Sequence, residues 1–215
     1  MLKYLKSSKI LMHSYCIEKM LSQTEDPTPI YRVKVIDNLG IETAAYLEPA
    51  KIEDMPYMSS PDFTFAWGDF WQKSDFDCEA IIKISYEGKV LGLIRFGLYP
   101  YCFPGEYTPE YIEVSHLQCI SKKRRLVNPV GFWLLWYAAQ IGFNYCVGET
   151  DDTLLILDSL KDAIPYYRDK VKMEELGWTD ISPGEEGYAF RFTKERAKEF
   201  CTRIEREYGH PVRLG

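Results

Sequence analysis

The sequence predicts one α/β domain built on a mixed β-sheet and preceded by an N-terminal helix. A chain of 215 residues with 46% hydrophobic and 15% aromatic residues has enough apolar side chains for one full core. Runs of β-forming residues alternate with helical runs in its second half. A helical crossover between two strands returns the chain in the same direction, so at least one strand pair is expected to be parallel.

The N-terminal segment is predicted to be a helix outside the domain. Residues 2–21 carry apolar side chains at helical spacing with lysines between them. Pro27 and Pro29 follow, and proline ends a helix because it fixes φ and removes a backbone donor. We therefore divide the chain into 1–27 and a single domain at 28–215. Polar residues interrupt the apolar run and no small-x-small cleavage site follows, so we expect a cytoplasmic protein.

The first half of the domain is expected to be mostly strands. A strand is predicted at 30–37, and two β-rich runs within 78–100 meet at the turn dipeptide Glu87-Gly88, which is typical of a hairpin. Between them, residues 57–80 hold many aromatic residues and aspartates without a clear period. We interpret this stretch as a helix and loop packed on the core, and its acidity suits a cationic partner.

The second half alternates strands and helices. Strands are predicted at 111–120, 153–160 and 186–193, and helices at 128–143, 162–178 and 194–209. For the first of these helices, Asn128 is expected to be the N-cap and Pro129 the first helical residue.

Charge and cysteine usage exclude several classes of function. The net charge of -6 and pI of about 5.2 argue against binding nucleic acid, which needs a basic surface. The six cysteines form no CxxC pair and the three histidines lie far apart, so no metal site is expected. No stretch is long and apolar enough to span a membrane. Any anion site must be local, and the densest basic run is 122–125.

The order of the elements resembles the GNAT superfamily of acyl-CoA-dependent N-acyltransferases over residues 78–192. The hairpin strand "GKVLGLIRFG" and the stretch "LDSLKDAIPYYRDKVKMEELGW", with its A-x-x-x-Y and terminal Leu-Gly-aromatic, carry the resemblance. It implies acetyl-CoA or another acyl-CoA as co-substrate, and an amine of a small molecule or protein as acceptor. It also implies that the strands at 111–120 and 153–160 are parallel and splayed apart at one end.

The resemblance places the cofactor loop at "SKKRRLVNPVGFWLL", which keeps one of the expected glycines. Glycines let backbone N–H groups approach a pyrophosphate at a helix N-terminus, where the macrodipole favours anions. We expect the basic run to replace part of that loop, although a solvated loop without ligand accounts for it equally well. The residues assigned to acyl-CoA are Leu117, Cys119, Lys123, Arg124, Arg125, Val130 and Gly131.

Two adjacent tyrosines open the helix predicted at 162–178. Residues that are neighbours in sequence lie about 100° apart around an α-helix, so one ring is expected to pack and the other to meet the cleft. The resemblance makes Tyr167 the general acid and Tyr166 the packing residue. Tyr167 also fits an apolar stripe with Ile164 and Val171, which leaves a purely structural role open.

For the general base, Glu113 is the first candidate and His116 the second. Both lie on the strand that the resemblance sets beside the thioester. Strand alternation predicts opposite faces for them, so one at most serves.

The sequence thus predicts an N-acyltransferase that moves an acyl group from CoA to an amine. The alternative is a catalytically inactive GNAT-like binding protein that acts through a protein partner.

Overall fold

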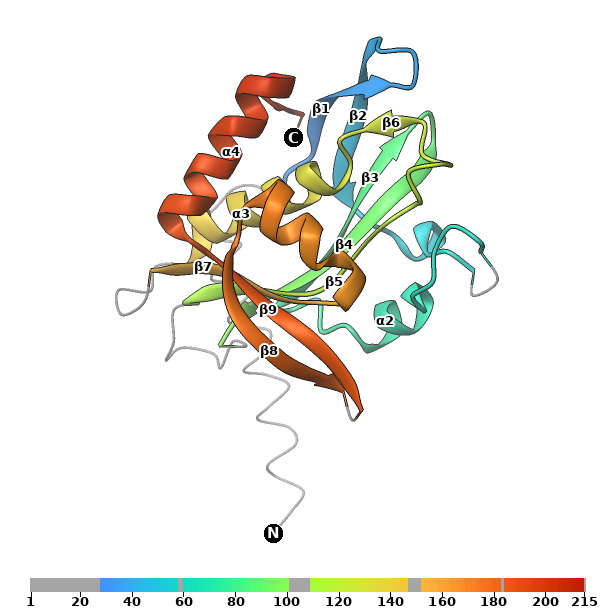
Figure 1. The fold of residues 1–215 in the computed structure, drawn as a ribbon. Coiled ribbons are helices and arrows are strands. Elements are labelled where there is room, and N and C mark those ends of the chain that lie inside the picture. Colours follow the sequence, from blue (N-terminus) through green and yellow to red (C-terminus); the bar gives the residue numbers. More distant parts are fainter. Residues whose placement is uncertain (1–27, 58–59, 101–108, 147–151, 183, 215) are drawn as a thin grey trace.

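The computed structural model describes residues 28–57, 60–100, 109–146, 152–182 and 184–214 (Figure 1). The helix predicted at 2–21 and the boundary at residue 27 lie outside these residues. In the described part, no helix has the length and apolar character needed to cross a membrane.

One mixed sheet organises the described part of the chain. Its strands follow the order β10-β1-β2-β3-β4-β5-β7-β9-β8, with β6 paired to β1, and only β5 and β7 are parallel among the described pairs. The predicted mixed α/β sheet is confirmed. The strands are β1 Tyr31–Asp37, β2 Glu42–Pro49, β3 Glu79–Tyr86, β4 Lys89–Tyr99, β5 Tyr111–Cys119, β6 Val127–Asn128, β7 Thr153–Ser159, β8 Glu174–Ser182, β9 Glu185–Thr193 and β10 Val212–Arg213.

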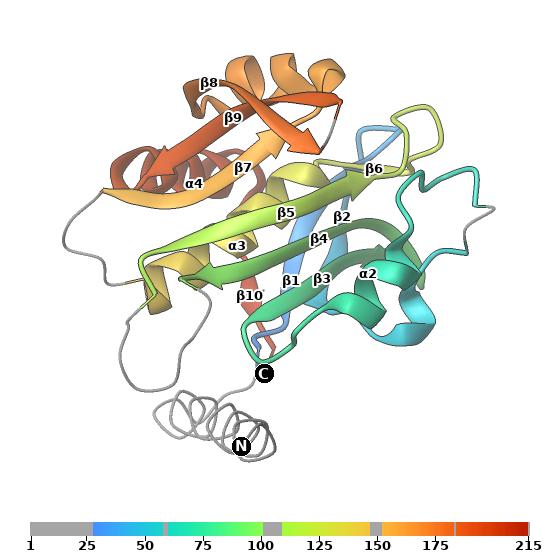
Figure 2. The ribbon, with the colours of Figure 1, turned by 90° about the horizontal axis from the view of Figure 1, so that it is seen from below.

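Helices cover both faces of the sheet. On one face lie α3 Gly131–Tyr145, α4 Lys194–Tyr208 and a π-helical turn, Tyr166–Val171. On the other lies α2 Trp67–Lys73, as Figure 2 shows. Short 3-10 turns occupy Ile52–Asp54 and Lys161–Ala163.

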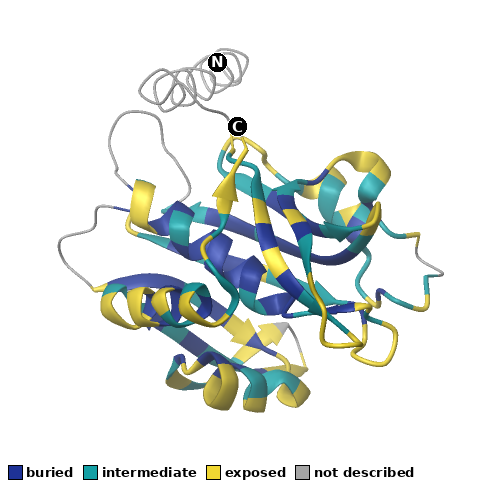
Figure 3. Cartoon of the chain, turned by 90° about the horizontal axis from the view of Figure 1, so that it is seen from above, coloured by how far each residue is buried: buried dark blue, intermediate teal, exposed yellow. Residues whose placement is uncertain are grey.

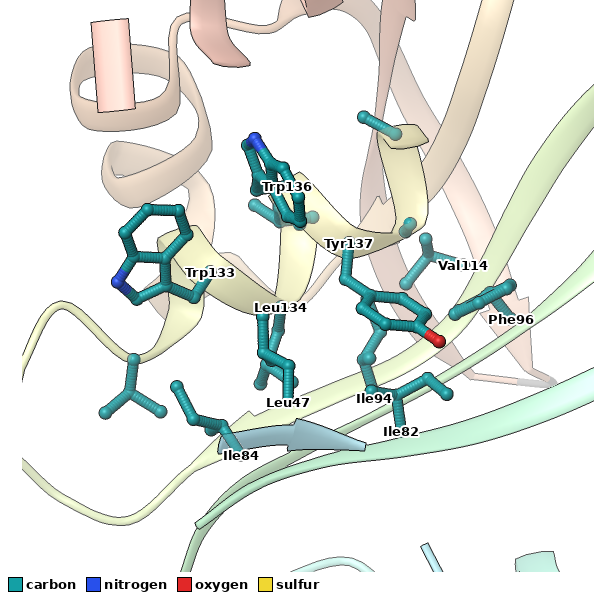
Figure 4. Close-up of a cluster of buried hydrophobic side chains, with 14 of the residues drawn as sticks. Leu47, Ile82, Ile84, Ile94, Phe96, Val114, Trp133, Leu134, Trp136 and Tyr137 are labelled. Atoms are coloured by element: carbon teal, nitrogen blue, oxygen red, sulfur yellow. The ribbon is translucent and has the colours of Figure 1, made fainter. Parts of the chain in front are cut away.

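The core lies between α3 and the sheet. α3 is apolar nearly all round because α4 covers the side that the sheet leaves open, whereas α4 keeps one exposed face (Figure 3). Trp133, Leu134 and Tyr137 of α3 reach down onto the strands, and the Tyr137 side chain lies over Ile82 and Phe96 (Figure 4). Truncating such a buried aromatic to alanine costs about 3–5 kcal/mol.

The predicted hairpin is confirmed, with β3 and β4 joined at Glu87-Gly88. Both turn residues have positive φ, at 49° and 74°. This matches a type I′ turn, whose twist continues that of the strands.

The strands β5 and β7 are parallel but stay together only briefly. Their pairing runs from Ile112↔Leu155 to Val114↔Leu157, while β5 continues to Cys119. Figure 2 shows β7 turning away from β5 beyond these pairs. The predicted splay is therefore present, and it opens the sheet at the carboxyl ends of both strands.

Two predicted elements are wrong in their bounds. The helix expected at 162–178 ends at Val171, and Leu176, Gly177 and Trp178 belong to β8. The left-handed conformation of Lys172, with φ 68°, turns the chain from the π-helix toward this strand.

The predicted start of α3 is also wrong. Asn128 is not an N-cap: it lies in β6, opposite Ile36, and Val130 precedes the first helical residue. The preference of asparagine for caps was overridden by strand pairing with β1.

Candidate functional site

A cavity of about 640 Å³ lies at the first turn of α3. Residues from β5, the 120–130 connection, the π-helix and α4 form its wall. A volume of this size is typical of sites for small molecules and cofactors. The wall consists of Leu117, Cys119, Ile120, Ser121, Lys122, Arg125, Asn128, Pro129, Val130, Gly131, Phe132, Ala163, Tyr166, Tyr167 and Tyr208.

The N-terminus of α3 faces this cavity without a side-chain cap. Val130 holds the cap position and makes no side-chain hydrogen bond, and the first intrahelical bond is that from the Leu134 N–H to the Val130 carbonyl. The N–H groups of the first turn therefore have no partner within the helix. Together with the helix dipole, they favour an anion at this end of the cavity.

Gly131 is required by a close contact with Tyr166. A Cβ at position 131 would lie 2.6 Å from the Tyr166 hydroxyl and 3.5 Å from the Cys119 Sγ. Any larger residue there displaces the phenol. The single glycine that remains of the predicted loop thus serves to let Tyr166 lie against the start of α3.

Three polar groups meet beside this glycine. The Arg125 Nε and the Tyr166 hydroxyl are buried and have no hydrogen-bond partner among the described residues. Burial raises the pKa of the Cys119 thiol to about 11, which the Arg125 guanidinium partly opposes. Burial also raises the pKa of Tyr166 well above its ordinary value. At neutral pH the phenol keeps its proton, so this wall presents unpaired donors to a ligand.

Both tyrosines line the cavity, contrary to the expectation that only one would. The predicted angle applies to an α-helix, whereas Tyr166–Val171 is a π-helix with a wider turn. Tyr166 stacks on Phe132 with ring centroids 5.7 Å apart. Tyr167 is 6% exposed and lies 5.7 Å from the Phe190 ring. Burial raises the pKa of Tyr167 as well.

The basic run divides between the cavity and the surface. Lys122 and Arg125 belong to the cavity wall. Lys123 and Arg124 do not, and the Arg124 Nε lies 3.0 Å from an Asp62 carboxylate oxygen. Arg125 is thus the predicted basic residue that the fold brings to the start of α3.

The predicted cofactor residues otherwise come together. Leu117 and Cys119 of β5 meet Val130, Gly131 and the tyrosines in one wall. Sequence reasoning missed Tyr208, which α4 brings to the cavity from the C-terminal end of the chain. No local signal marks it, because its role depends on how α4 packs.

The opposite face of β5 carries Glu113 and His116. The register against β4 shifts at Ser115, since Phe96 pairs with Val114 while Arg95 pairs with His116. This β-bulge reverses the alternation, so Glu113 and His116 lie on the same face of the sheet. The expectation that they lie on opposite faces is therefore wrong.

An aromatic cluster covers His116 on this face. Its ring lies 3.8 Å from that of Phe70 and 5.5 Å from that of Phe65. Burial, and secondarily the Arg95 charge, lowers the pKa of His116 to about 4. The imidazole is therefore neutral at neutral pH, and its buried Nδ1 has no hydrogen-bond partner among the described residues.

Gln118 fixes this cluster to β5. Its Oε1 accepts hydrogen bonds from the Phe65 N–H at 3.2 Å and the Trp67 Nε1 at 3.0 Å, and its Nε2 donates to the Thr64 hydroxyl at 2.7 Å. One amide thus holds the segment before α2 against the strand.

Comparison with known proteins bears on the fold. No protein-family model matches the sequence, and no curated protein is similar to it in sequence. An uncharacterized protein from Bacillus halodurans has a similar structure, with a TM-score of 0.54 and 10% identity over 82% of this chain and 97% of that one. A likeness at this identity concerns the fold alone.

Two acetyltransferase structures are more distant in shape. The aminoglycoside acetyltransferase AAC(6')-Ib, in complex with coenzyme A and kanamycin, matches with a TM-score of 0.48 and 12% identity over 72% of this chain and 98% of that one. RimJ of Mycobacterium smegmatis, in complex with CoA-disulfide, matches with a TM-score of 0.48 and 10% identity over 84% of this chain and 95% of that one. The mixed sheet with its splayed parallel pair is the architecture predicted from the sequence. The activity has to be argued from this chain's own residues.

Proposed function

We propose that the protein is an N-acyltransferase that moves an acetyl or other acyl group from CoA to an amine. The observation that carries the proposal is the cavity at the uncapped start of α3, beside the point where β5 and β7 part. The start of α3 favours the anionic end of the cofactor, and the strands β5 and β7 part beside it.

Within this proposal, the cavity wall binds the cofactor. The first-turn N–H groups of α3, the Arg125 guanidinium and the Tyr166 hydroxyl supply donors for phosphate oxygens. Leu117 supplies apolar contact along β5. Side-chain donors thus take the place of the glycines that the cofactor loop lacks. One of them is the Tyr166 phenol, for which the sequence analysis predicted a packing role.

The catalytic roles stay with Tyr167 and Glu113. An amine attacks the thioester carbonyl as a neutral nucleophile, and the departing thiolate needs a proton. Tyr167 lies in the cavity wall with a protonated phenol and is the proposed donor. Glu113 lies on the opposite face and is the proposed acceptor of the amine's proton, directly or through water.

Calorimetric titration with acetyl-CoA tests the proposal, with dephospho-CoA as a parallel ligand. Specific binding of acetyl-CoA, together with release of free CoA thiol when an amine is added, is the expected result. Absence of binding by the full chain would refute it.

A non-catalytic binding protein is the second candidate. The observation that favours it is the contact of the Tyr166 hydroxyl with the start of α3. There the phenol occupies space in which a ligand would otherwise meet the first-turn N–H groups of the helix. The titration separates the two candidates, because a protein that has lost the cofactor binds no acetyl-CoA.

A further inference from the structure

The cavity adjoins a surface patch that the roles above leave unassigned. Lys122 belongs to the cavity wall, and the residues that follow it lie on the surface. The exposed turn between β1 and β2 lies beside them and extends the patch. We call this surface the rim patch, and its residues are Leu39, Ile41, Lys122, Lys123 and Leu126.

Strand pairing brings the two segments of the rim patch together. Val127 of β6 lies opposite Asp37 at the end of β1. The Asn38 Nδ2 donates a hydrogen bond to the Arg125 carbonyl oxygen at 3.3 Å. Figure 2 shows the turn after β1 beside the connection that leads into β6. Because Arg125 also belongs to the cavity wall, the rim patch is continuous with the cavity.

The rim patch exposes three aliphatic side chains. Leu39 is 84% exposed, Ile41 57% and Leu126 38%. Single exposed apolar residues are common on protein surfaces, whereas a group of them beside a cavity is typical of a binding surface. Covering such side chains removes apolar area from water and so favours association.

The charge of the rim patch is opposite to that of the whole chain. Lys122 and Lys123 are exposed, and neither has a hydrogen-bond or ion-pair partner among the described residues. The next residue, Arg124, is paired with Asp62 at 3.0 Å. The chain as a whole has a net charge of -6. A local basic surface on an acidic chain favours an acidic partner that docks at this place.

The donors of the cavity wall match one phosphate group. The Tyr166 hydroxyl and the Arg125 Nε are buried without a partner among the described residues, and both residues line the cavity at the first turn of α3. Lys123 and Arg124 lie outside the wall. A phosphopantetheine arm carries a single phosphate, at the end that joins it to its carrier. With that phosphate at the start of α3, the carrier itself lies over the rim patch.

We propose that the cavity also accepts the acyl group from the phosphopantetheine arm of a small acidic carrier protein, which docks on the rim patch. This inference rests on the proposed acyl transfer. CoA contains the same arm and fills the cavity without the rim patch. A membrane surface suits the rim patch less well, because it would leave the buried donors of the cavity unused.

The transfer from the carrier follows the same chemistry as the transfer from CoA. The amine nitrogen forms a bond to the acyl carbon as the carbon–sulfur bond breaks. The amine gives up one proton, and the departing arm takes one to become a thiol. The products are an amide and the carrier with a free thiol on its arm.

An acyl carrier protein tests the inference, because it is a small acidic protein that is made with and without the arm. Calorimetric titration of the full chain compares the acetylated holo form, the apo form that lacks the arm, and acetyl-CoA. We expect the acetylated holo form to bind and the apo form to bind at least about tenfold more weakly, since it cannot fill the cavity. Binding of the carrier should weaken as salt is added.

Lys123→Glu separates the rim patch from the cavity. The reversed charge repels an acidic carrier and should weaken it about tenfold or more, while acetyl-CoA affinity should change by less than about fivefold. Leu39→Ser should weaken the carrier about three- to tenfold through lost apolar contact. Lys198→Glu is the matched control, because Lys198 is an exposed lysine of α4 outside the rim patch and the cavity wall, and it should leave both ligands unchanged.

Three results would overturn the inference while acetyl-CoA still binds. They are no binding of the acetylated holo carrier, equal weakening by Lys123→Glu and Lys198→Glu, and vesicles of anionic phospholipid that bind through Lys123 while the carrier is unaffected by its reversal. Failure of the full chain to bind acetyl-CoA would instead refute the proposed function on which the inference rests.

Discussion

The two faces of β5 differ in chemistry although nine consecutive residues supply both. On the α3 side, Leu117 and Cys119 belong to the wall of the cavity. The unpaired polar groups of that wall are donors, namely the Arg125 Nε and the Tyr166 hydroxyl. On the α2 side, Glu113 and His116 bring an acid and a neutral imidazole among aromatic rings. One face therefore presents hydrogen-bond donors at a cavity, and the other presents a carboxylate and a neutral imidazole.

The bulge at Ser115 produces this division. A regular strand would send Glu113 and His116 to opposite faces, whereas the extra residue places both on the α2 side and keeps Leu117 with Cys119 on the cavity side. One inserted residue is enough to place Glu113 and His116 on one face of the strand and Leu117 and Cys119 on the other. The predictions below test whether the two faces act separately.

The largest effect is expected at the proposed acid. Tyr167→Phe removes one hydroxyl from a buried ring and should lower kcat about 10²–10⁴-fold, with little change in acetyl-CoA affinity. Steady-state kinetics with calorimetry measures both. Tyr166→Phe is the matched control and should weaken binding more than turnover; the reverse pattern would exchange the two roles.

The next largest effect is expected at Arg125, in the cavity wall. Arg125→Ala removes a guanidinium of the cavity wall and should weaken acetyl-CoA binding about 10–100-fold, the value of a hydrogen bond to a charged group. The double variant Lys123→Ala with Arg124→Ala tests the two basic residues outside the cavity wall and should change affinity by less than about fivefold, as exposed charges do. Equal losses in both variants would mean that charge alone, not the cavity wall, binds the cofactor.

A smaller effect is expected on the α2 side. Gln118→Ala leaves the Phe65 N–H and the Trp67 Nε1 without their acceptor and should lower the free energy of unfolding by about 1–3 kcal/mol. Thermal unfolding should show a smaller loss for Thr64→Ala, which removes one of the three bonds. Acetyl-CoA affinity should stay unchanged in both, since a change would show that the two faces are coupled.

The last prediction is a pH dependence of stability. Because the pKa of His116 is lowered from 6.5 to about 4 by folding, the unfolded chain binds a proton between these values that the folded chain does not. Stability should therefore fall as the pH drops from 6.5 toward 4. Urea unfolding of His116→Phe, which keeps a stacked ring, should show a shallower fall than the unmodified protein, whereas exposed His210→Gln should not.

The sequence by itself determined part of the order of the elements, although it did not predict β2, β6 or β10 and placed the first half of β8 in a helix. Alternation and apolar runs predicted the hairpin, the strands on either side of α3 and the apolar helix itself, because these patterns follow from local burial. They also indicated the parallel pair, since a helical crossover leaves no other direction. The cavity residues Leu117, Cys119, Arg125, Val130 and Gly131 were found through the resemblance.

Only the tertiary structure decided where the side chains face. The bulge at Ser115 depends on pairing with β4, the π-helix at Tyr166 turns both tyrosines to the cavity, and β6 removes Asn128 from the start of α3. Each depends on contacts between segments far apart in the sequence, and local propensity carries no record of them.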